Sequence, residues 1–311
     1  MSQAPIAPGR ARGPFAFLVD NATIMLSTTM ICWAGNFIIG RWSSGHVPPI
    51  MLAWSRWTLA ALILLPFCWR KLRADLPAIR THWKILLLLG LTGAGLFNSL
   101  QYLALNHTIA LNALLINSSG PVFIALACLT LFGDRIGLGQ WLGISLSMLG
   151  VLLVGTRGDI IAIGTFQFAL GDILMLIAMV TWGVYTAFLR KRPAIHFLSF
   201  AVVQMIIASA INAPFVLWES ALGAELVPSL RSLISIAYCA VFPSIIAYLC
   251  YFRGVQLIGG ARAGAYIHLT TLFGAILSIV LLGESMQPYH IAGFVLIVAG
   301  VMIATRFGRP A

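Results

Sequence analysis

The chain has 311 residues, of which 60% are hydrophobic and only 9% are charged. Soluble domains are about 45–50% apolar and about 25% charged, so this composition excludes an ordinary soluble enzyme and a disordered chain. The net charge of +11 comes from 19 Lys and Arg set against 8 Asp and Glu, not from dense basic patches. We therefore expect a membrane protein without a nucleic-acid partner, in which excess Lys and Arg mark cytoplasmic loops.

Ten apolar stretches are long enough to cross a bilayer, which takes about 20 mainly apolar residues. They cover residues 20–41, 48–69, 83–104, 109–131, 137–155, 168–189, 195–217, 229–256, 262–282 and 287–305. The first stretch follows a basic tail, as in a signal peptide, but it is too long for one and nine spans follow it. The sequence thus predicts an all-α integral membrane protein whose first helix is retained.

The basic residues predict how these spans are oriented. With the N-terminus inside, fifteen of the 19 Lys and Arg lie on the cytoplasmic side. Those on the outer side are Arg41, Arg157 and Arg231, and Arg56 lies within a span. We therefore expect both tails, 1–19 and 307–311, in the cytoplasm, and we expect the protein in the inner membrane.

An internal repeat relates the two halves of the chain. Residues 133–151 (GDRIGLGQWLGISLSMLGV) and 283–301 (GESMQPYHIAGFVLIVAGV) share three glycines, a leucine and a valine at a constant shift of 150 residues. Because each half holds five spans, an odd number, the second copy runs through the membrane in the opposite direction. The predicted domains are 20–155 and 168–306, joined by an external connector, 156–167. Such inverted repeats are typical of secondary transporters, with the substrate site between the halves.

Several motifs carry a resemblance to a known family. GDRI and GESM close the fourth span of each half, a helix with two glycines seven residues apart follows each, and the chain opens with ICWAGNFIIGRW and LAWSRWTLAALILL. This pattern over residues 20–306 resembles EamA-type members of the drug/metabolite transporter superfamily, and within them bacterial exporters of aromatic amino acids. The resemblance implies a basket of helices around a central cavity, with the fourth and fifth spans of each half as scaffold.

Motifs for other chemistry are missing from the sequence. There is no G-x-x-x-x-G-K-[ST] segment to bind ATP and no H-E-x-x-H zinc motif. Gly143-Ile-Ser145-Leu-Ser147 departs from G-x-S-x-G, and the five cysteines form no C-x-x-C pair, as expected of small buried side chains. We therefore expect no enzyme activity, cofactor, metal or obligate protein partner, only a small-molecule substrate and the lipid bilayer.

Ionisable side chains inside a bilayer are costly and mark candidate sites. Arg56 lies roughly 10 Å into its span, at 1.5 Å per residue. Its side chain could extend outward to water, or face a cavity and attract a carboxylate. His268 could equally be a buried, satisfied histidine or a substrate contact. No Asp or Glu lies at a span centre, and Asp172 and Glu284 lie at helix ends, where solvation costs less.

The missing central carboxylate favours neutral or zwitterionic cargo and facilitated diffusion without ATP. The resemblance, together with this missing carboxylate, implies an exporter of amino acids with broad specificity, including aromatic and other neutral ones. The alternative among transporters is proton-coupled export of drugs, nucleosides or other metabolites, in which His268 would titrate. The alternative of a different class is a polytopic membrane enzyme.

Polar and aromatic side chains in matched spans of the two halves predict the cavity. Pro121 also deprives the Asn117 carbonyl of its helical donor, which is tolerated in a membrane beside a watery cavity. Each aromatic could instead pack between helices or sit at the membrane interface. The predicted lining is Trp33, Asn36, Phe37, Ser99, Tyr102, Asn117, Trp182, Tyr185, Tyr248 and His268, with Arg56 at the outer rim.

Overall fold

The computed structural model describes residues 20–159, 169–258, 263 and 266–306, and within them every regular element is helical. The first half contains α2 (Ala22–Trp42), α3 (Pro49–Thr81), α4 (Trp83–Leu89), the π-helix η1 (Gly90–Leu96), α5 (Phe97–His107), α6 (Ala110–Asn117), α7 (Gly120–Phe132) and α8 (Leu138–Gly155). The second half contains α9 (Leu170–Phe188), the short η3 (Leu189–Lys191), α10 (Phe197–Ala221), α11 (Leu230–Val241), the π-helix η4 (Phe242–Ile246), α12 (Ala247–Ile258), α14 (Ile267–Leu282) and α15 (Pro288–Arg306). The predicted tails and most of the predicted connector lie outside the described residues.

Seven helical segments of the described chain are long and apolar enough to span a membrane. The pair α6 and α7, bent by 45° at the break between them, gives an eighth. The two remaining apolar helical segments, Ile267–Leu282 (α14) and Pro288–Ala304 within α15, are shorter than these. The all-helical membrane fold is thus confirmed, whereas the count of ten spans stays a prediction.

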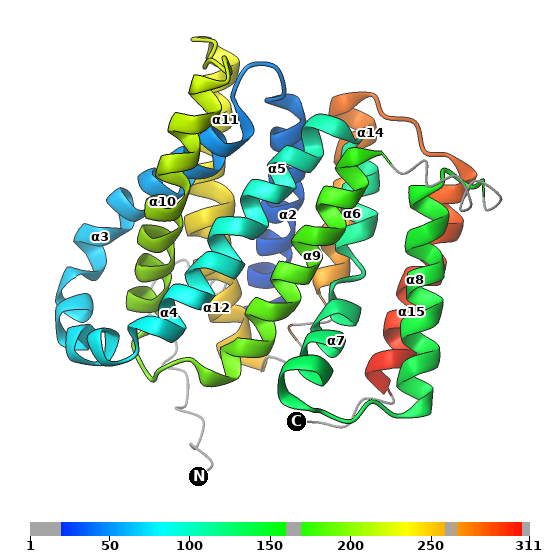
Figure 1. Cartoon of the computed structure of the whole chain (residues 1–311), viewed down its shortest axis with the longest axis horizontal. Helices are drawn as coiled ribbons and strands as arrows, with labels where there is room; N and C mark the ends of the chain where they lie inside the picture. Colours follow the sequence, from blue (N-terminus) through cyan, green and yellow to red (C-terminus); the bar gives the residue numbers. More distant parts are fainter. Residues whose placement is uncertain (1–19, 160–168, 259–262, 264–265, 307–311) are drawn as a thin grey trace.

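The helices form one bundle in which consecutive segments alternate in direction (Figure 1). α2 begins and α15 ends at the same end of this bundle. We name it the α9–α10 end, after the link 189–196, and we name the opposite end the α2–α3 end, after the link 43–48. The predicted cytoplasmic location of both tails agrees with the start of α2 and the end of α15 lying at one end, but the side of the membrane stays a prediction.

Local geometry repeats at the 150-residue shift. Gly133 and Gly283 both end a helix in the left-handed conformation, with φ of +69° and +68°, which glycine adopts without a Cβ penalty. The next amide bonds back across each turn, from Asp134 to Cys128 and from Glu284 to Ser278. The two π-helices, η1 and η4, also fall at equivalent places in the halves. The sequence repeat is therefore a structural repeat.

Candidate functional site

A central cavity lies between the two halves of the bundle. One compartment, of about 100 Å³, is lined by side chains from α2, α3, η1, α5, α7, α9, α12 and α14, together with the end of α6. A second compartment, of about 240 Å³, shares Trp33, Ile124, Trp182, Tyr248 and Ile267 with the first. It continues to Arg192, an exposed residue of the α9–α10 link. The cavity therefore extends from the bundle centre toward the α9–α10 end.

Arg56 is the cation of the first compartment. Its side chain does not extend outward: the residue is 3% exposed and lines the cavity. Nε donates to Ser244 Oγ at 2.7 Å, and one terminal nitrogen donates to Asn98 Oδ1 at 2.6 Å, Tyr102 Oη at 2.9 Å and Asn36 Oδ1 at 3.2 Å. The expected position at an outer rim is thus corrected, because four neutral acceptors from the three elements α2, α5 and η4 hold the guanidinium inside.

These contacts leave hydrogen-bond donors facing the cavity. An arginine side chain has no acceptor, so the amides of Asn36 and Asn98 must turn their oxygens toward it and keep their NH2 groups for other partners. Ser244 and Tyr102 donate onward, to the Cys239 carbonyl and to Asn36 Oδ1. The second terminal nitrogen of Arg56 has no hydrogen-bond partner among the described residues. We call Arg56, Asn36 and Asn98 the donor pole.

None of the described residues lining either compartment is an Asp or a Glu. A buried charge costs several kcal/mol of desolvation that a partner of opposite charge offsets. Here the guanidinium contacts neutral oxygens and lies over the Trp57 ring, 4.3 Å from its centroid, without an acidic partner among the described residues. An anionic group of a ligand would supply the missing opposite charge.

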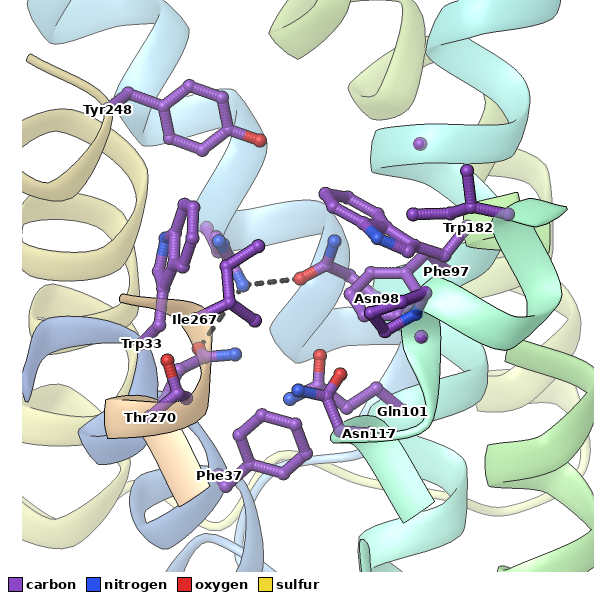
Figure 2. Close-up of a pocket in the computed structure, with 16 residues that line it drawn as sticks. Trp33, Phe37, Phe97, Asn98, Gln101, Asn117, Trp182, Tyr248, Ile267 and Thr270 are labelled. Carbon is purple, nitrogen blue, oxygen red and sulfur yellow. Dashed lines mark hydrogen bonds between the residues drawn. The ribbon is translucent and has the colours of Figure 1, made fainter. Parts of the chain in front are cut away.

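Aromatic side chains flank the donor pole. The Trp33 ring packs against Tyr248 and Tyr251, with centroids 6.3 and 5.4 Å away, while Trp182 packs against Phe97 and Tyr185 at 5.0 and 5.2 Å. Figure 2 shows the Trp33 and Trp182 groups on opposite sides of one open space. The Trp33 indole donates to the Pro243 carbonyl at 3.3 Å, which anchors it to the π-helix η4. Such faces suit an apolar or aromatic group.

An amide pair lies on another side of the same space. Gln101 and Asn117 line the first compartment, and Figure 2 shows their amide groups beside each other, directed inward. Gln101 is only 1% exposed, and its Nε2 is buried without a hydrogen-bond partner among the described residues. We call this pair the amide pole.

Eight of the eleven predicted site residues line the cavity. The first compartment is lined by Trp33, Asn36, Phe37, Arg56, Asn117, Trp182 and Tyr248, and Tyr185 lines the second. Sequence reasoning did not select Phe97, Asn98, Gln101, Ser244 and Thr270 for the site. The signal for the four polar ones was a polar side chain in an otherwise apolar span, which Asn98 and Gln101 share with Ser99, whereas nothing in the sequence singled out Phe97.

Three predicted residues do not line the cavity. Ser99 faces away from it and donates to Asn212 Oδ1 on α10 at 2.6 Å. Tyr102 lies behind Arg56, fully buried, where it supports the donor pole. His268 lines neither compartment, and its Nδ1 is buried without a hydrogen bond. The sequence alone does not show which side chains of a helix face the cavity and which face a neighbouring helix.

Contacts between the two halves join helices at the α2–α3 end, and the described parts of the links at this end contribute no residue to the lining of either compartment. Glu284 accepts hydrogen bonds from the amides of Ala110 and Leu111 at 2.8 and 2.9 Å, at the start of α6. Glu219 of α10 accepts from Ile50 and Met51 at 3.1 and 2.9 Å, at the start of α3. Carboxylates at helix N-termini satisfy unpaired amides and favour the helix dipole.

Asp172 also lies toward this end, but it does not have the solvation expected at a helix terminus. It is 1% exposed and accepts a hydrogen bond from Thr108 at 2.6 Å. Nearby, His290 is 1% exposed and bonds to Asn112 Oδ1 at 3.0 Å. These contacts join α9 to the α5–α6 link and α15 to α6, away from the cavity. Among the described residues no His, Cys, Asp or Glu cluster could hold a metal ion.

Relatives of this chain are described as transporters. It is 26% identical to an "uncharacterized transporter" of Archaeoglobus fulgidus, over 91% of this chain and 96% of the relative. It is 26% identical to the uncharacterized transporter YyaM of Bacillus subtilis, over 92% and 93%. It is 24% identical to the uncharacterized inner membrane transporter YedA of Escherichia coli K12, over 88% and 87%.

The comparison with solved structures concerns the fold alone. One crystal structure matches with a TM-score of 0.57 and 20% identity, covering 92% of this chain and 96% of the other. The family model for EamA-like transporters matches twice, over residues 21–156 and 169–306, and these ranges coincide with the two structural repeats. The chain is a membrane transporter that belongs to the EamA-like transporter family.

Proposed function

We propose that this protein exports amino acids across the inner membrane, with broad specificity that includes aromatic and other neutral ones. The observation that carries the proposal is the buried Arg56, which faces the central cavity among neutral acceptors. A guanidinium carries the charge that complements a carboxylate, and a hydrogen bond between two such charged groups is stronger than one between neutral groups. The free terminal nitrogen of Arg56 and the NH2 groups of Asn36 and Asn98 supply the donors.

The cavity suits an amino-acid side chain as well as a carboxylate. The aromatic faces of Trp33 and Trp182 adjoin the donor pole, and the second compartment offers further apolar space. A wide apolar compartment discriminates only weakly between side chains, because each methylene is worth about 1–3 kcal/mol. Recognition of the common carboxylate with tolerance of the side chain gives broad specificity.

Transport would proceed by alternating access, as the two-repeat architecture supports. The described conformation has its α2–α3 end closed and its cavity extending toward the α9–α10 end. The predicted orientation makes the latter end cytoplasmic, so the protein would load its cargo inside. The inner-membrane location is supported by the description of the Escherichia coli relative. Facilitated diffusion without ATP follows from the absence of a nucleotide motif and of an acid among the described lining residues.

Proteoliposome uptake of labelled L-phenylalanine tests the proposal. A hydrogen bond to a charged group is worth about 1.5–3 kcal/mol, or roughly 10- to 100-fold in an equilibrium. We expect Arg56→Gln to lower kcat/KM by that factor and Arg56→Lys to retain part of the activity. The matched control is Arg135→Gln, since Arg135 lies exposed in the α7–α8 link. Failure of the wild type to carry any amino acid, or full activity of Arg56→Gln, would overturn the proposal.

A further inference from the structure

The amide pole presents unused polar groups where a ligand would lie. Gln101 is almost completely buried and lines the first compartment, and its Nε2 is buried without a hydrogen-bond partner among the described residues. A buried polar atom without a partner costs about 1–3 kcal/mol, so the Gln101 amide calls for a ligand or a solvent partner. The half-buried side chain of Asn117 lies next to it (Figure 2).

The break between α6 and α7 adds a carbonyl to this pole. Pro121 has no N–H, so the helical bond to the Asn117 carbonyl is missing. The same proline removes one amide donor from the first turn of α7. The C-terminal end of α6 carries the partial negative charge of the helix dipole. The amide pole therefore has oxygens that can accept hydrogen bonds, namely the two side-chain oxygens and the Asn117 carbonyl, whereas the guanidinium of the donor pole can only donate.

We propose that the amide pole binds the α-ammonium group of the cargo, through the side-chain oxygens of Gln101 and Asn117 and the freed Asn117 carbonyl. This inference rests on the proposed function and assigns the second charge of the zwitterion. Since no described residue of the cavity lining is acidic, the ammonium group is held by neutral dipoles while Arg56 holds the carboxylate. Cargo with an amino group but no carboxylate therefore meets Arg56 as a like charge and is rejected.

Two substrates that differ only in the amino group test the assignment. L-phenylalanine has both charged groups, and 3-phenylpropionate lacks the ammonium. In proteoliposomes we expect Gln101→Leu to lower kcat/KM for L-phenylalanine by about fivefold or more. The same variant should change kcat/KM for 3-phenylpropionate by less than about twofold. Arg56→Gln should lower both. The matched control is Gln140→Leu, because Gln140 lies on α8 and does not line the cavity.

A second variant keeps the test decisive if Gln101→Leu fails to fold. Gln101→Glu preserves the side-chain shape and gives the ammonium a carboxylate partner, so the preference for L-phenylalanine over 3-phenylpropionate should rise about tenfold. An unchanged preference in the folded variants would overturn the amide-pole assignment while leaving the proposed function standing. Failure of the wild type to carry either compound, with Arg56 intact, would instead overturn the proposed function.

Discussion

Gly143 of α8 and Gly300 of α15 lie against each other's backbone. A Cβ atom placed on Gly143 would come within 2.5 Å of the Gly300 carbonyl oxygen, and one on Gly300 within 2.6 Å of the Gly143 carbonyl oxygen. Gly150 and Gly293 repeat the relationship one heptad away, at 2.7 and 3.1 Å. Adding 150 to Gly143 gives Gly293, and subtracting it from Gly300 gives Gly150. Each contact is thus the image of the other, as an inverted repeat requires.

A methyl group at this contact should loosen the α8–α15 pair. We expect Gly143→Ala or Gly300→Ala to destabilise the fold by about 1–3 kcal/mol, the usual cost of overpacking. The control is Gly137→Ala, because a Cβ there has nothing within 4 Å. Thermal unfolding of the detergent-purified variants measures the difference. Equal melting temperatures for Gly143→Ala and Gly137→Ala would contradict the close contact.

Loss of the Glu284 carboxylate should favour opening of the α2–α3 end. Replacing a capping group by Ala costs about 0.5–2 kcal/mol. Because Glu284 caps α6 across the closed end, its loss destabilises the closed state and leaves the open state unchanged. In a background without native cysteines, a Ser118→Cys probe is buried and should react faster with an impermeant thiol reagent in Glu284→Ala. Glu225→Ala, in the exposed α10–α11 link, serves as the control. No difference in reaction rate between the two would show that this contact does not hold the end shut.

Removing the Tyr102 hydroxyl should weaken substrate binding without removing the cation. The hydroxyl accepts from Arg56 and donates to Asn36, so Tyr102→Phe frees the guanidinium to turn. One neutral hydrogen bond is worth about 0.5–1.5 kcal/mol. We expect KM for L-phenylalanine to rise several-fold with little change in kcat. Tyr289→Phe is the matched control, because Tyr289 lies at the α2–α3 end, outside the central cavity. Unchanged KM in Tyr102→Phe would mean that the donor pole does not bind the cargo.

Thiol labelling should decide the orientation. Residue 225 lies in the α10–α11 link at the α2–α3 end and residue 194 in the α9–α10 link, and both are exposed. In intact cells, the charge bias predicts that Glu225→Cys reacts with an impermeant reagent and Ala194→Cys does not. Permeabilised cells, in which both should react, provide the control. The reverse pattern would invert the assigned topology and the direction of loading.

Flux should follow the substrate gradient and ignore an imposed pH gradient. No Asp or Glu is found among the described residues of the cavity lining, and His268 lies outside both compartments. Proteoliposomes with equal labelled amino acid on both sides should therefore show no net accumulation when the inside is made acidic or alkaline. An ionophore-treated sample is the control. Accumulation driven by the proton gradient would refute facilitated diffusion and direct attention to the buried pair Asp172 and His290.

The sequence by itself determined the membrane fold and its repeat. A bilayer leaves no alternative to helices for so apolar a chain, because each backbone group must be bonded within the protein. The repeat was readable because close helix contact admits only small residues, so Gly143 and Gly150 recur as Gly293 and Gly300. Gly133 and Gly283 recur because a left-handed helix end favours glycine.

Only the tertiary structure decided which side chains meet. In a bundle that is apolar on all faces, periodicity does not reveal which face of a helix lines a cavity. From the sequence alone, the Arg56 side chain could extend outward to water. In the structure it is enclosed by Asn36, Asn98 and Ser244, which come from elements far apart in the chain. Ser99 and Gln101 are two residues apart in α5, yet one bonds to α10 and the other faces the cavity. Their directions differ because two residues turn a helix by about 200°, and only packing shows where each direction leads.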